Sequence, residues 1–212
     1  FILLLKNYYL RKKTNLQIKF LFLFFILTTP VSAHTYTGMI GFYDGLSHPV
    51  LGMDHFLAMV SVGIISAQIG GRSILIIPST FVGMMIVGGL IGIFAEINFF
   101  LSQVYISMFV EYGIILSVIS LGLIIALEKK FSLKISIIFI IFFGLCHGSA
   151  HGMEMPWAIN PLLFVTGFTF GTAILHLFGV GIGIFSIKTK FTSLLLRISG
   201  IGCVVFGLYL FY

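Results

Sequence analysis

The chain is built from apolar runs long enough to cross a lipid bilayer, which takes about 20 mostly apolar residues in a helix. Six such runs lie near residues 47–69, 73–95, 104–127, 133–155, 158–186 and 192–211. The 212 residues are 59% hydrophobic and 8% charged, a composition far from that of a soluble domain. An open strand would leave backbone groups unpaired in lipid, and the strict alternation of a membrane barrel is absent from the sequence. The sequence therefore predicts an all-α, polytopic membrane helical bundle of six transmembrane helices.

The residues before these runs have the features of a cleaved signal peptide. The stretch "FLFLFFILTT" (20–29) has the length of a signal-peptide core, Pro30 ends it, and small residues suited to cleavage lead to Ala33. Five basic residues precede this core: Lys6, Arg11, Lys12, Lys13 and Lys19. We expect a signal peptide over 1–33 and a transmembrane domain over 34–212, with an uncleaved first helix as the alternative.

The basic residues of the mature chain all fall on one predicted side of the membrane. If His34 starts the mature chain outside the cytoplasm, the first, third and fifth connections between spans face the cytoplasm. These connections and their edges hold Arg72, Lys129, Lys130, Lys134, Lys188, Lys190 and Arg197. The positive-inside rule is then satisfied throughout. We expect a protein of the bacterial cytoplasmic membrane with its mature N-terminus on the periplasmic side. The net charge of +6 is spread over helix ends, so we expect the lipid bilayer and not nucleic acid as its partner.

Ionisable residues within the spans gather toward the outer, periplasmic ends of three predicted helices. They are His48, Asp54 and His55 on the first helix, Glu111 on the third, and His147, His151 and Glu154 on the fourth. Such residues are costly in a membrane and indicate a functional site. At about 100° per residue, His147, His151 and Glu154 share one face of their helix, and so do His48 and His55.

Imidazole nitrogen combined with carboxylate oxygen suits divalent first-row metals such as nickel, cobalt or zinc, whereas calcium and magnesium prefer all-oxygen sites. The seven residues therefore predict a metal site between the helices. Asp54 either binds the metal or orients a histidine from behind it. Pro49 is expected at the first helical position of its span. His34, near the mature N-terminus, and His176, near mid-span, are weaker candidates for metal ligands.

Four segments resemble the HupE/UreJ family. "GFYDGLSHPVLGMDHFLAMVSVGIISAQIGGR" (41–72) contains the family's His-Pro-x-x-Gly-x-Asp-His core, and "FGLCHGSAHGMEMP" (143–156) contains His-Gly-x-Ala-His-Gly-x-Glu. "VEYGIILS" (110–117) is similar to the third-helix segment of that family, with Glu111 and Ser117 in place. The "SAHTYTG" that follows the signal segment is similar to the family's mature start. The resemblance covers nearly the whole mature chain.

The resemblance implies a permease for nickel or cobalt, often linked to hydrogenase or urease maturation. We therefore expect a secondary transporter and not an enzyme. Ni²⁺ or Co²⁺ would be its transported substrate, no cofactor would stay bound, and metallochaperones or maturation proteins are possible partners. No glycine-rich phosphate loop is present, so the chain itself is no ATPase.

Two alternatives use the same residues in other ways. "HGSAH" (147–151) has the His-x-x-x-His spacing of di-iron sites, although the His-Glu-x-x-His of zinc proteases is absent. A membrane-embedded metalloenzyme with a di-iron or zinc site is therefore the first alternative. A b-type haem protein with His55 and His147 as axial ligands is the second.

Overall fold

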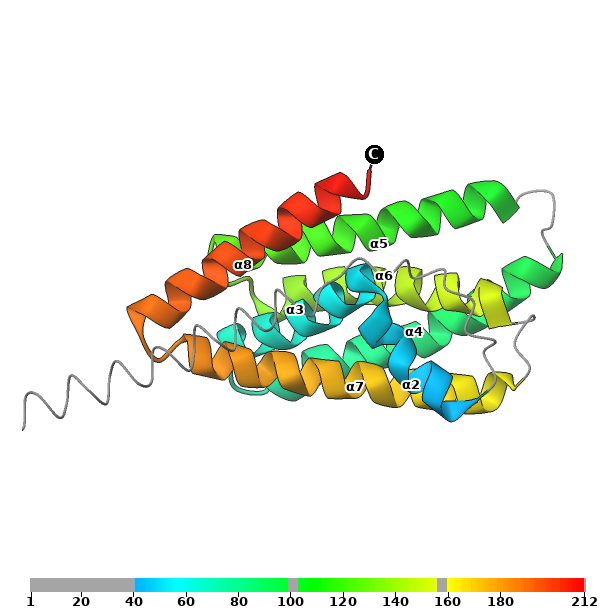
Figure 1. Cartoon of the computed structure of the whole chain (residues 1–212), viewed down its shortest axis with the longest axis horizontal. Helices are drawn as coiled ribbons and strands as arrows, with labels where there is room; N and C mark the ends of the chain where they lie inside the picture. Colours follow the sequence, from blue (N-terminus) through cyan, green and yellow to red (C-terminus); the bar gives the residue numbers. More distant parts are fainter. Residues whose placement is uncertain (1–40, 99–102, 156–159, 212) are drawn as a thin grey trace, which may run out of the picture. The chain divides into compact units, whose positions relative to one another are not determined.

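The computed structural model describes residues 41–98, 103–155 and 160–211, and every regular element in these ranges is a helix. In chain order the helices are α2 (Phe42–Leu51), α3 (Met53–Ile69), α4 (Ser73–Asn98), α5 (Gln103–Ala126), α6 (Leu133–Glu154), α7 (Pro161–Ser186) and α8 (Lys190–Tyr209) (Figure 1). The expected signal peptide and His34 lie outside the described residues.

Five of these helices, α4 to α8, are long and apolar enough to cross a membrane. Helices α2 and α3 meet the same test when taken together as one span, which is bent by 83°. Within the described residues this gives five spans, or six with the bent pair, and the predicted all-α polytopic membrane bundle is confirmed. The bounds of α4 to α8 lie within a few residues of the predicted runs.

The first span differs from its prediction at the start. Helix α2 begins at Phe42 and not near residue 47, and Pro49 lies inside it and not at its first position. The early start has a local cause, because the Asp44 carboxylate accepts a hydrogen bond from the Gly41 backbone N–H at 3.3 Å. An acceptor in the first turn satisfies an amide that the helix leaves unpaired, so the helix extends back into the polar segment.

The break between α2 and α3 lies at Gly52, which adopts an extended conformation with φ −80° and ψ 110°. The Gly52 N–H still donates to the His48 carbonyl at 3.1 Å, and the Gly52 carbonyl accepts from the Phe56 N–H at 2.8 Å. The chain therefore turns without leaving these groups unpaired in the membrane, where an unpaired group is costly. Pro49, which has no backbone N–H to donate, further weakens the last turn of α2.

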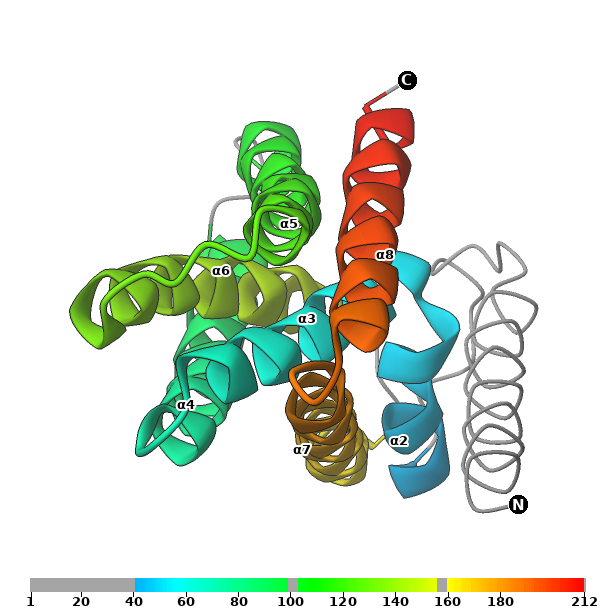
Figure 2. The same cartoon turned by 90° about the vertical axis from the view of Figure 1, so that its left-hand side faces the viewer.

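Helix α3 lies at the centre of the bundle. It packs along α7 and also contacts α4, α5 and α6, and Figure 2 shows it between these neighbours. Every residue of α3 from Leu57 to Ala67 is buried. A helix enclosed on every side has no polar face to keep in water, which accounts for the apolar and small residues all around it. The other extensive contacts are α4 with α6, α2 with α7, and α5 with α8.

Glycines let the main pairs of helices touch backbone to backbone. A Cβ added at Gly92 of α4 would lie 2.2 Å from the Ser149 carbonyl oxygen of α6, and one at Gly63 of α3 would lie 2.1 Å from the His176 carbonyl oxygen of α7. Small residues at helix contacts are the usual means of close packing in membranes, where lipid gives no hydrophobic drive for association. The polar residues of α3, α6 and α7 are thereby enclosed between helices and kept away from lipid.

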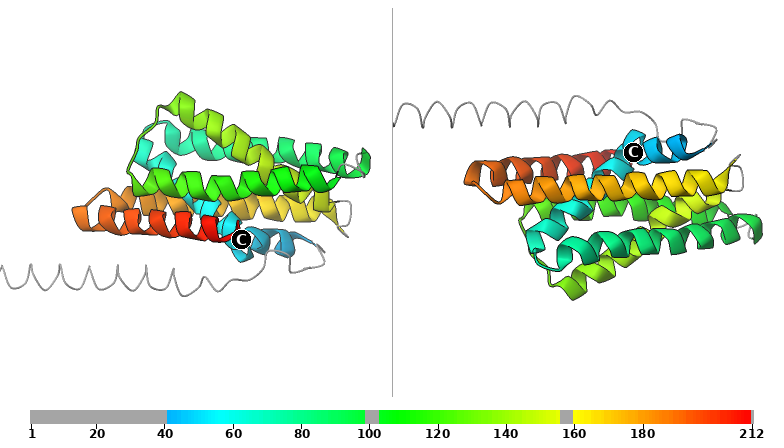
Figure 3. Two further views of the ribbon diagram at one scale, coloured as in Figure 1. Left: turned by 90° about the horizontal axis from the view of Figure 1, so that it is seen from above. Right: turned by 90° about the horizontal axis from the view of Figure 1, so that it is seen from below.

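The connections that carry the basic residues all lie at one end of the helices. The links α3–α4, α5–α6 and α7–α8 lie toward the left of Figure 1 and toward the left of both views in Figure 3. We call this the basic end. The Nε–H of Arg197 donates to the Ala126 carbonyl oxygen at 3.0 Å, so this side chain caps the end of α5 there. The histidine motifs of α2 and α6 lie toward the opposite end.

We expect Gly92→Ala to lower the thermal unfolding temperature of the purified protein in detergent. The new methyl group would force α4 and α6 apart, and overpacking of this kind costs about 1–3 kcal/mol. Gly83→Ala is the matched control on the same helix, because nothing lies within 4 Å of a Cβ there. Alanine is the better helix former, so the control should unfold at the same or a higher temperature. Equal unfolding temperatures for the two variants would contradict the close packing of α4 on α6.

Candidate metal centre

Two segments far apart in the sequence meet at the bend between α2 and α3. His48 lies near the end of α2, His55 near the start of α3, and His151 in the last turns of α6. The ring centroid of His151 is 4.8 Å from that of His48 and 4.6 Å from that of His55. All three residues are buried, with at most 9% of their surface exposed. The two histidine motifs of the sequence therefore face each other inside the bundle.

His55 is held by the carboxylate of its own neighbour. Asp54 Oδ1 accepts hydrogen bonds from the backbone N–H and the ring Nδ1–H of His55, each at 2.9 Å. An ionised carboxylate can only accept, so Nδ1 carries the hydrogen and Nε2 is the ring nitrogen left for other partners. A carboxylate placed in this way fixes the orientation of a metal-binding imidazole and raises its basicity. Of the two roles that the sequence left open for Asp54, this geometry favours orienting His55.

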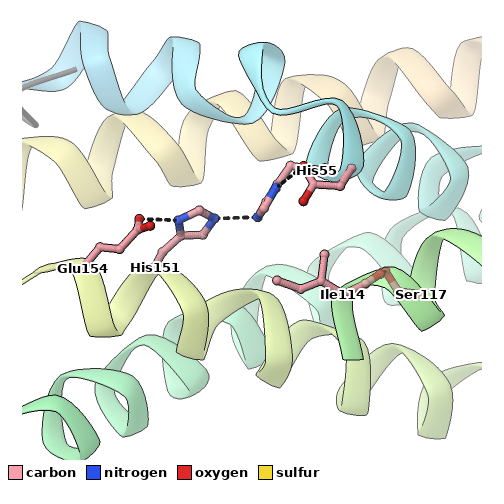
Figure 4. Close-up of polar contacts among 6 residues, drawn as sticks. His55, Ile114, Ser117, His151 and Glu154 are labelled. Atoms are coloured by element: carbon pink, nitrogen blue, oxygen red, sulfur yellow. Dashed lines mark hydrogen bonds and ion pairs between the residues drawn. The ribbon is translucent and has the colours of Figure 1, made fainter. Parts of the chain in front are cut away.

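His55 and His151 meet nitrogen to nitrogen. Their Nε2 atoms are 2.7 Å apart, and Nδ1 of His151 lies 3.4 Å from Glu154 Oε2. Figure 4 shows the resulting row of Glu154, His151 and His55. At 2.7 Å one ring nitrogen must donate to the other. Two nitrogens bound to one tetrahedral ion are roughly 3.3 Å apart, so the rings must separate slightly to share a metal ion.

The ligand atoms of His48, His151 and Glu154 lie within 4.8 Å of one another. Two imidazole nitrogens and a carboxylate oxygen form a set that fits nickel, cobalt or zinc, and Nε2 of His55 extends the set through its contact with His151. The Glu154 side chain is 39% exposed, against 8% for His151. An ion would therefore meet Glu154 first and the imidazoles after it. We refer to His48, His55, His147, His151 and Glu154 as the histidine cluster.

His147 is the innermost member of the histidine cluster on α6. Its Nδ1–H donates to the Phe143 carbonyl at 3.0 Å, and its ring centroid is 5.1 Å from that of His55. Its Nε2 is buried and has no hydrogen-bond partner among the described residues. In a neutral ring with the hydrogen on Nδ1, Nε2 has a free lone pair, which is the form that binds metal. His147 thus offers an unused ligand nitrogen beside His55.

The other predicted site residues lie at the edge of the histidine cluster or outside it. Glu111 is half-buried on α5 and interacts electrostatically with His55, a position from which it can balance the charge of a bound cation. His176 lies on α7, where its ring packs against Phe81 at a centroid distance of 5.2 Å. The structure therefore brings together His48, Asp54, His55, His147, His151 and Glu154, with Glu111 nearby, and leaves His176 apart.

Aromatic rings enclose the histidine cluster, and sequence reasoning missed them. The rings of Phe164 and Phe168 on α7 lie 5.5 and 5.8 Å from that of His48, and Phe168 lies 4.4 Å from His151. These contacts fix the imidazole planes and keep lipid away from the polar atoms. Nothing in the sequence marked them, because the chain has 24 phenylalanines and only the packing of α7 on α2 and α3 selects these two.

Comparisons with known proteins agree with the motifs. A family model described as "HupE / UreJ protein" matches residues 22–210. The chain is also 39% identical over 158 residues to "Protein HupE" of Rhizobium leguminosarum bv. viciae, and the match covers 74% of this chain and 78% of that protein. No solved structure matches the chain.

We expect the purified protein to bind Co²⁺, and we expect Asp54→Asn and His151→Ala to weaken this binding to different extents. Loss of a carboxylate that orients a ligand histidine typically costs about 10–100-fold in metal affinity. His151 contacts both other imidazoles at the bend, so its removal should cost more than Asp54→Asn does. The visible absorption of bound Co²⁺ measures the affinity of each variant during titration.

Tyr43→Phe serves as the control for these titrations, because Tyr43 is an exposed residue of α2 at the same end of the bundle, and it should bind Co²⁺ like the parent. If Asp54→Asn bound as weakly as His151→Ala, Asp54 would be a direct ligand and the orienting role would be wrong. If Asp54→Asn bound like the parent, the carboxylate would have no part in the site.

Proposed function

Because the chain belongs to the HupE/UreJ family, we propose that it is a secondary transporter that carries Ni²⁺ or Co²⁺ inward across the bacterial cytoplasmic membrane. The family is generally associated with nickel and cobalt transport for hydrogenase or urease, so the imported metal would supply the maturation of such an enzyme. The metal is the transported substrate in this proposal, and no cofactor stays bound.

The observation that carries the proposal is a cluster of metal-ligand side chains buried between membrane spans. His48, His151 and Glu154 come from two spans, and their ligand atoms lie within 4.8 Å of one another. A hydrated dication enters a membrane only if protein groups replace its water ligands. Imidazole nitrogens do so for first-row transition metals, and the carboxylates of Glu154, Asp54 and Glu111 offset the charge. Burial of so many ionisable groups in a membrane is costly unless they serve such a pathway.

The positions of the charged residues indicate the direction of transport. The basic end faces the cytoplasm by the positive-inside rule, so the histidine cluster opens toward the periplasm through Glu154. A dication that moves inward across an inside-negative potential of 100 mV gains about 4.6 kcal/mol, twice the value for one charge. That free energy corresponds to an accumulation of roughly three orders of magnitude. The membrane potential alone is therefore a sufficient driving force for uptake.

The composition of the histidine cluster favours a carrier over a di-iron enzyme. Its one carboxylate ligand, Glu154, is the residue nearest to solvent, and Asp54 is engaged with His55. A di-iron centre in a helical bundle is built largely from carboxylates on several helices. The interior members of the histidine cluster are imidazoles instead.

We expect His48→Ala and His151→Ala to reduce the initial rate of ⁶³Ni²⁺ uptake at least about tenfold, because each loses a ligand worth 1.4 kcal/mol or more. Uptake is measured in cells, or in membrane vesicles of known orientation. The samples being compared contain equal amounts of folded protein. Unlabelled Co²⁺, Zn²⁺ and Cu²⁺ are added in competition to rank the substrates. Two values of the membrane potential, set with valinomycin and potassium, test the driving force.

Glu96→Gln is the control for an acid that lies outside the histidine cluster on α4, and it should transport like the parent. Uptake at the parental rate by both histidine variants would refute the transport proposal. Uptake that is independent of the membrane potential would refute the driving force argued above and leave the substrate assignment standing.

A further inference from the structure

His176 is a buried imidazole without a hydrogen-bond partner among the described residues. Its side chain is 1% exposed, and neither Nδ1 nor Nε2 has a partner among the described residues. A neutral imidazole has one donor and one acceptor, and burying both of them unpaired destabilises the folded protein. A buried polar group of this kind calls for an explanation such as a bound water or ion. A Leu or Phe at this position would fill the space without that cost.

Two further polar atoms lie at the same contact between α4 and α7. Thr172 is one turn before His176, on the same face of α7, and is fully buried. Its hydroxyl points at the sulfur of Met85 on α4, with an Oγ1–Sδ distance of 3.9 Å. Met85 in turn lies one turn from Phe81, whose ring contacts His176. Where α4 and α7 pack together, the imidazole of His176 and the hydroxyl of Thr172 therefore lie on α7, and the thioether of Met85 lies on the facing side of α4.

Phe81 contacts both this site and the histidine cluster. Its fully buried ring packs against two imidazoles, with its centroid 5.4 Å from that of His147 and 5.2 Å from that of His176. Each imidazole has a nitrogen without a hydrogen-bond partner among the described residues. A ring that touches both imidazoles is placed to obstruct the passage of an ion from one to the other.

His176 also lies closer to the basic end than the histidine cluster does. It is roughly 15 Å from the end of α7 at Ser186, and Phe81 is roughly 12 Å from the start of α4 at Ser73, at 1.5 Å per residue. His151, by contrast, lies three residues from the far end of α6 at Glu154. By the same count His147 lies roughly 21 Å from the start of α6 at Leu133, so His176 and Phe81 both lie farther inward than the histidine cluster.

We propose that His176, Thr172 and Met85 form a second, inner station for the transported divalent metal, and that the Phe81 ring is the partition between this station and the histidine cluster. The proposal rests on the transport function proposed above. Nitrogen, oxygen and sulfur ligands suit a first-row transition metal and not calcium or magnesium. The three side chains carry no negative charge, so the station binds the ion weakly, which conduction requires of an inner site if the ion is to leave.

The test compares uptake with binding in the variant His176→Leu. Leucine removes the ligand and the unpaired nitrogens together, so the variant should fold and unfold at a temperature no lower than the parent. Its Co²⁺ affinity at the histidine cluster should equal that of the parent, while its initial rate of ⁶³Ni²⁺ uptake should fall at least about tenfold. A purely structural role for His176 would change the unfolding temperature and leave uptake per folded molecule unchanged.

Leu177→Ala is the matched control, because Leu177 is the next residue of α7 and is 66% exposed toward lipid. It should transport like the parent. Thr172→Val, which replaces only the hydroxyl, should lower uptake several-fold in the same assay. If His176→Leu is not recovered as folded protein, His176→Asn takes its place, since the smaller amide cannot overfill the site, and the same tenfold loss is expected.

The outcomes separate this proposal from the transport function. In one outcome, uptake needs His151 but proceeds at the parental rate in folded His176→Leu. This result is expected if His176 binds only a water molecule. It overturns the inner station and leaves the transport function intact. Uptake by the parent that does not depend on His151 contradicts the transport function itself. Loss of uptake in both variants, with Co²⁺ binding lost only in His151→Ala, supports both proposals.

Discussion

The contact between His55 and His151 joins the two halves of the histidine cluster, and the rest of the site is arranged around it. The two Nε2 atoms lie 2.7 Å apart, so the rings meet only if one donates and the other accepts. Asp54 fixes one ring from behind, and Glu154 lies next to the outer nitrogen of the other. The contact forms between α3 and α6, which otherwise touch little. The close packing of α3 on α7 and of α4 on α6 holds the two rings in reach of each other.

The bend at Gly52 determines how many imidazoles this contact can gather. On a straight helix His48 and His55 would lie roughly 10.5 Å apart along the axis, too far for both rings to touch one partner. With the helix bent by 83°, the ring centroids of both lie within 4.8 Å of that of His151. Gly52 accepts the extended conformation and Pro49 loosens the turn before it. In the first segment, Pro49 and Gly52 therefore bend the backbone so that His48 and His55 both reach His151.

The sequence was enough to predict the spans, the end of the helices at which the candidate site lies, and most of the residues that meet there. Each of these depends on a local pattern. Apolar runs determine the spans, and the i, i+4, i+7 spacing puts His147, His151 and Glu154 on one face. The start of the first span was predicted wrongly, since the Asp44 cap extends α2 back to Phe42.

What could not be predicted depends on contacts between helices distant in the sequence. Whether Asp54 faces an ion or His55 depends on the direction that α3 takes after the bend, and no spacing rule gives that direction. Phe81, Phe164 and Phe168 gain their roles only from the packing of α4 and α7 against the histidine motifs. In so apolar a chain, no sequence pattern distinguishes these phenylalanines from the others.

The distribution of carboxylates along the imidazoles has a consequence for an ion that passes them. Glu154 belongs to the histidine cluster, and Asp54 and Glu111 lie beside it, whereas in the described part of the chain the only acid at the basic end is Glu128. His176, which lies inward of the histidine cluster, has neutral neighbours in Thr172 and Met85. In the transport proposed above, attraction for a dication would therefore decrease inward while the membrane potential pulls the ion in that direction. A site of uniform high affinity would retain the ion, whereas strong capture outside and weak binding inside lets the potential move it on.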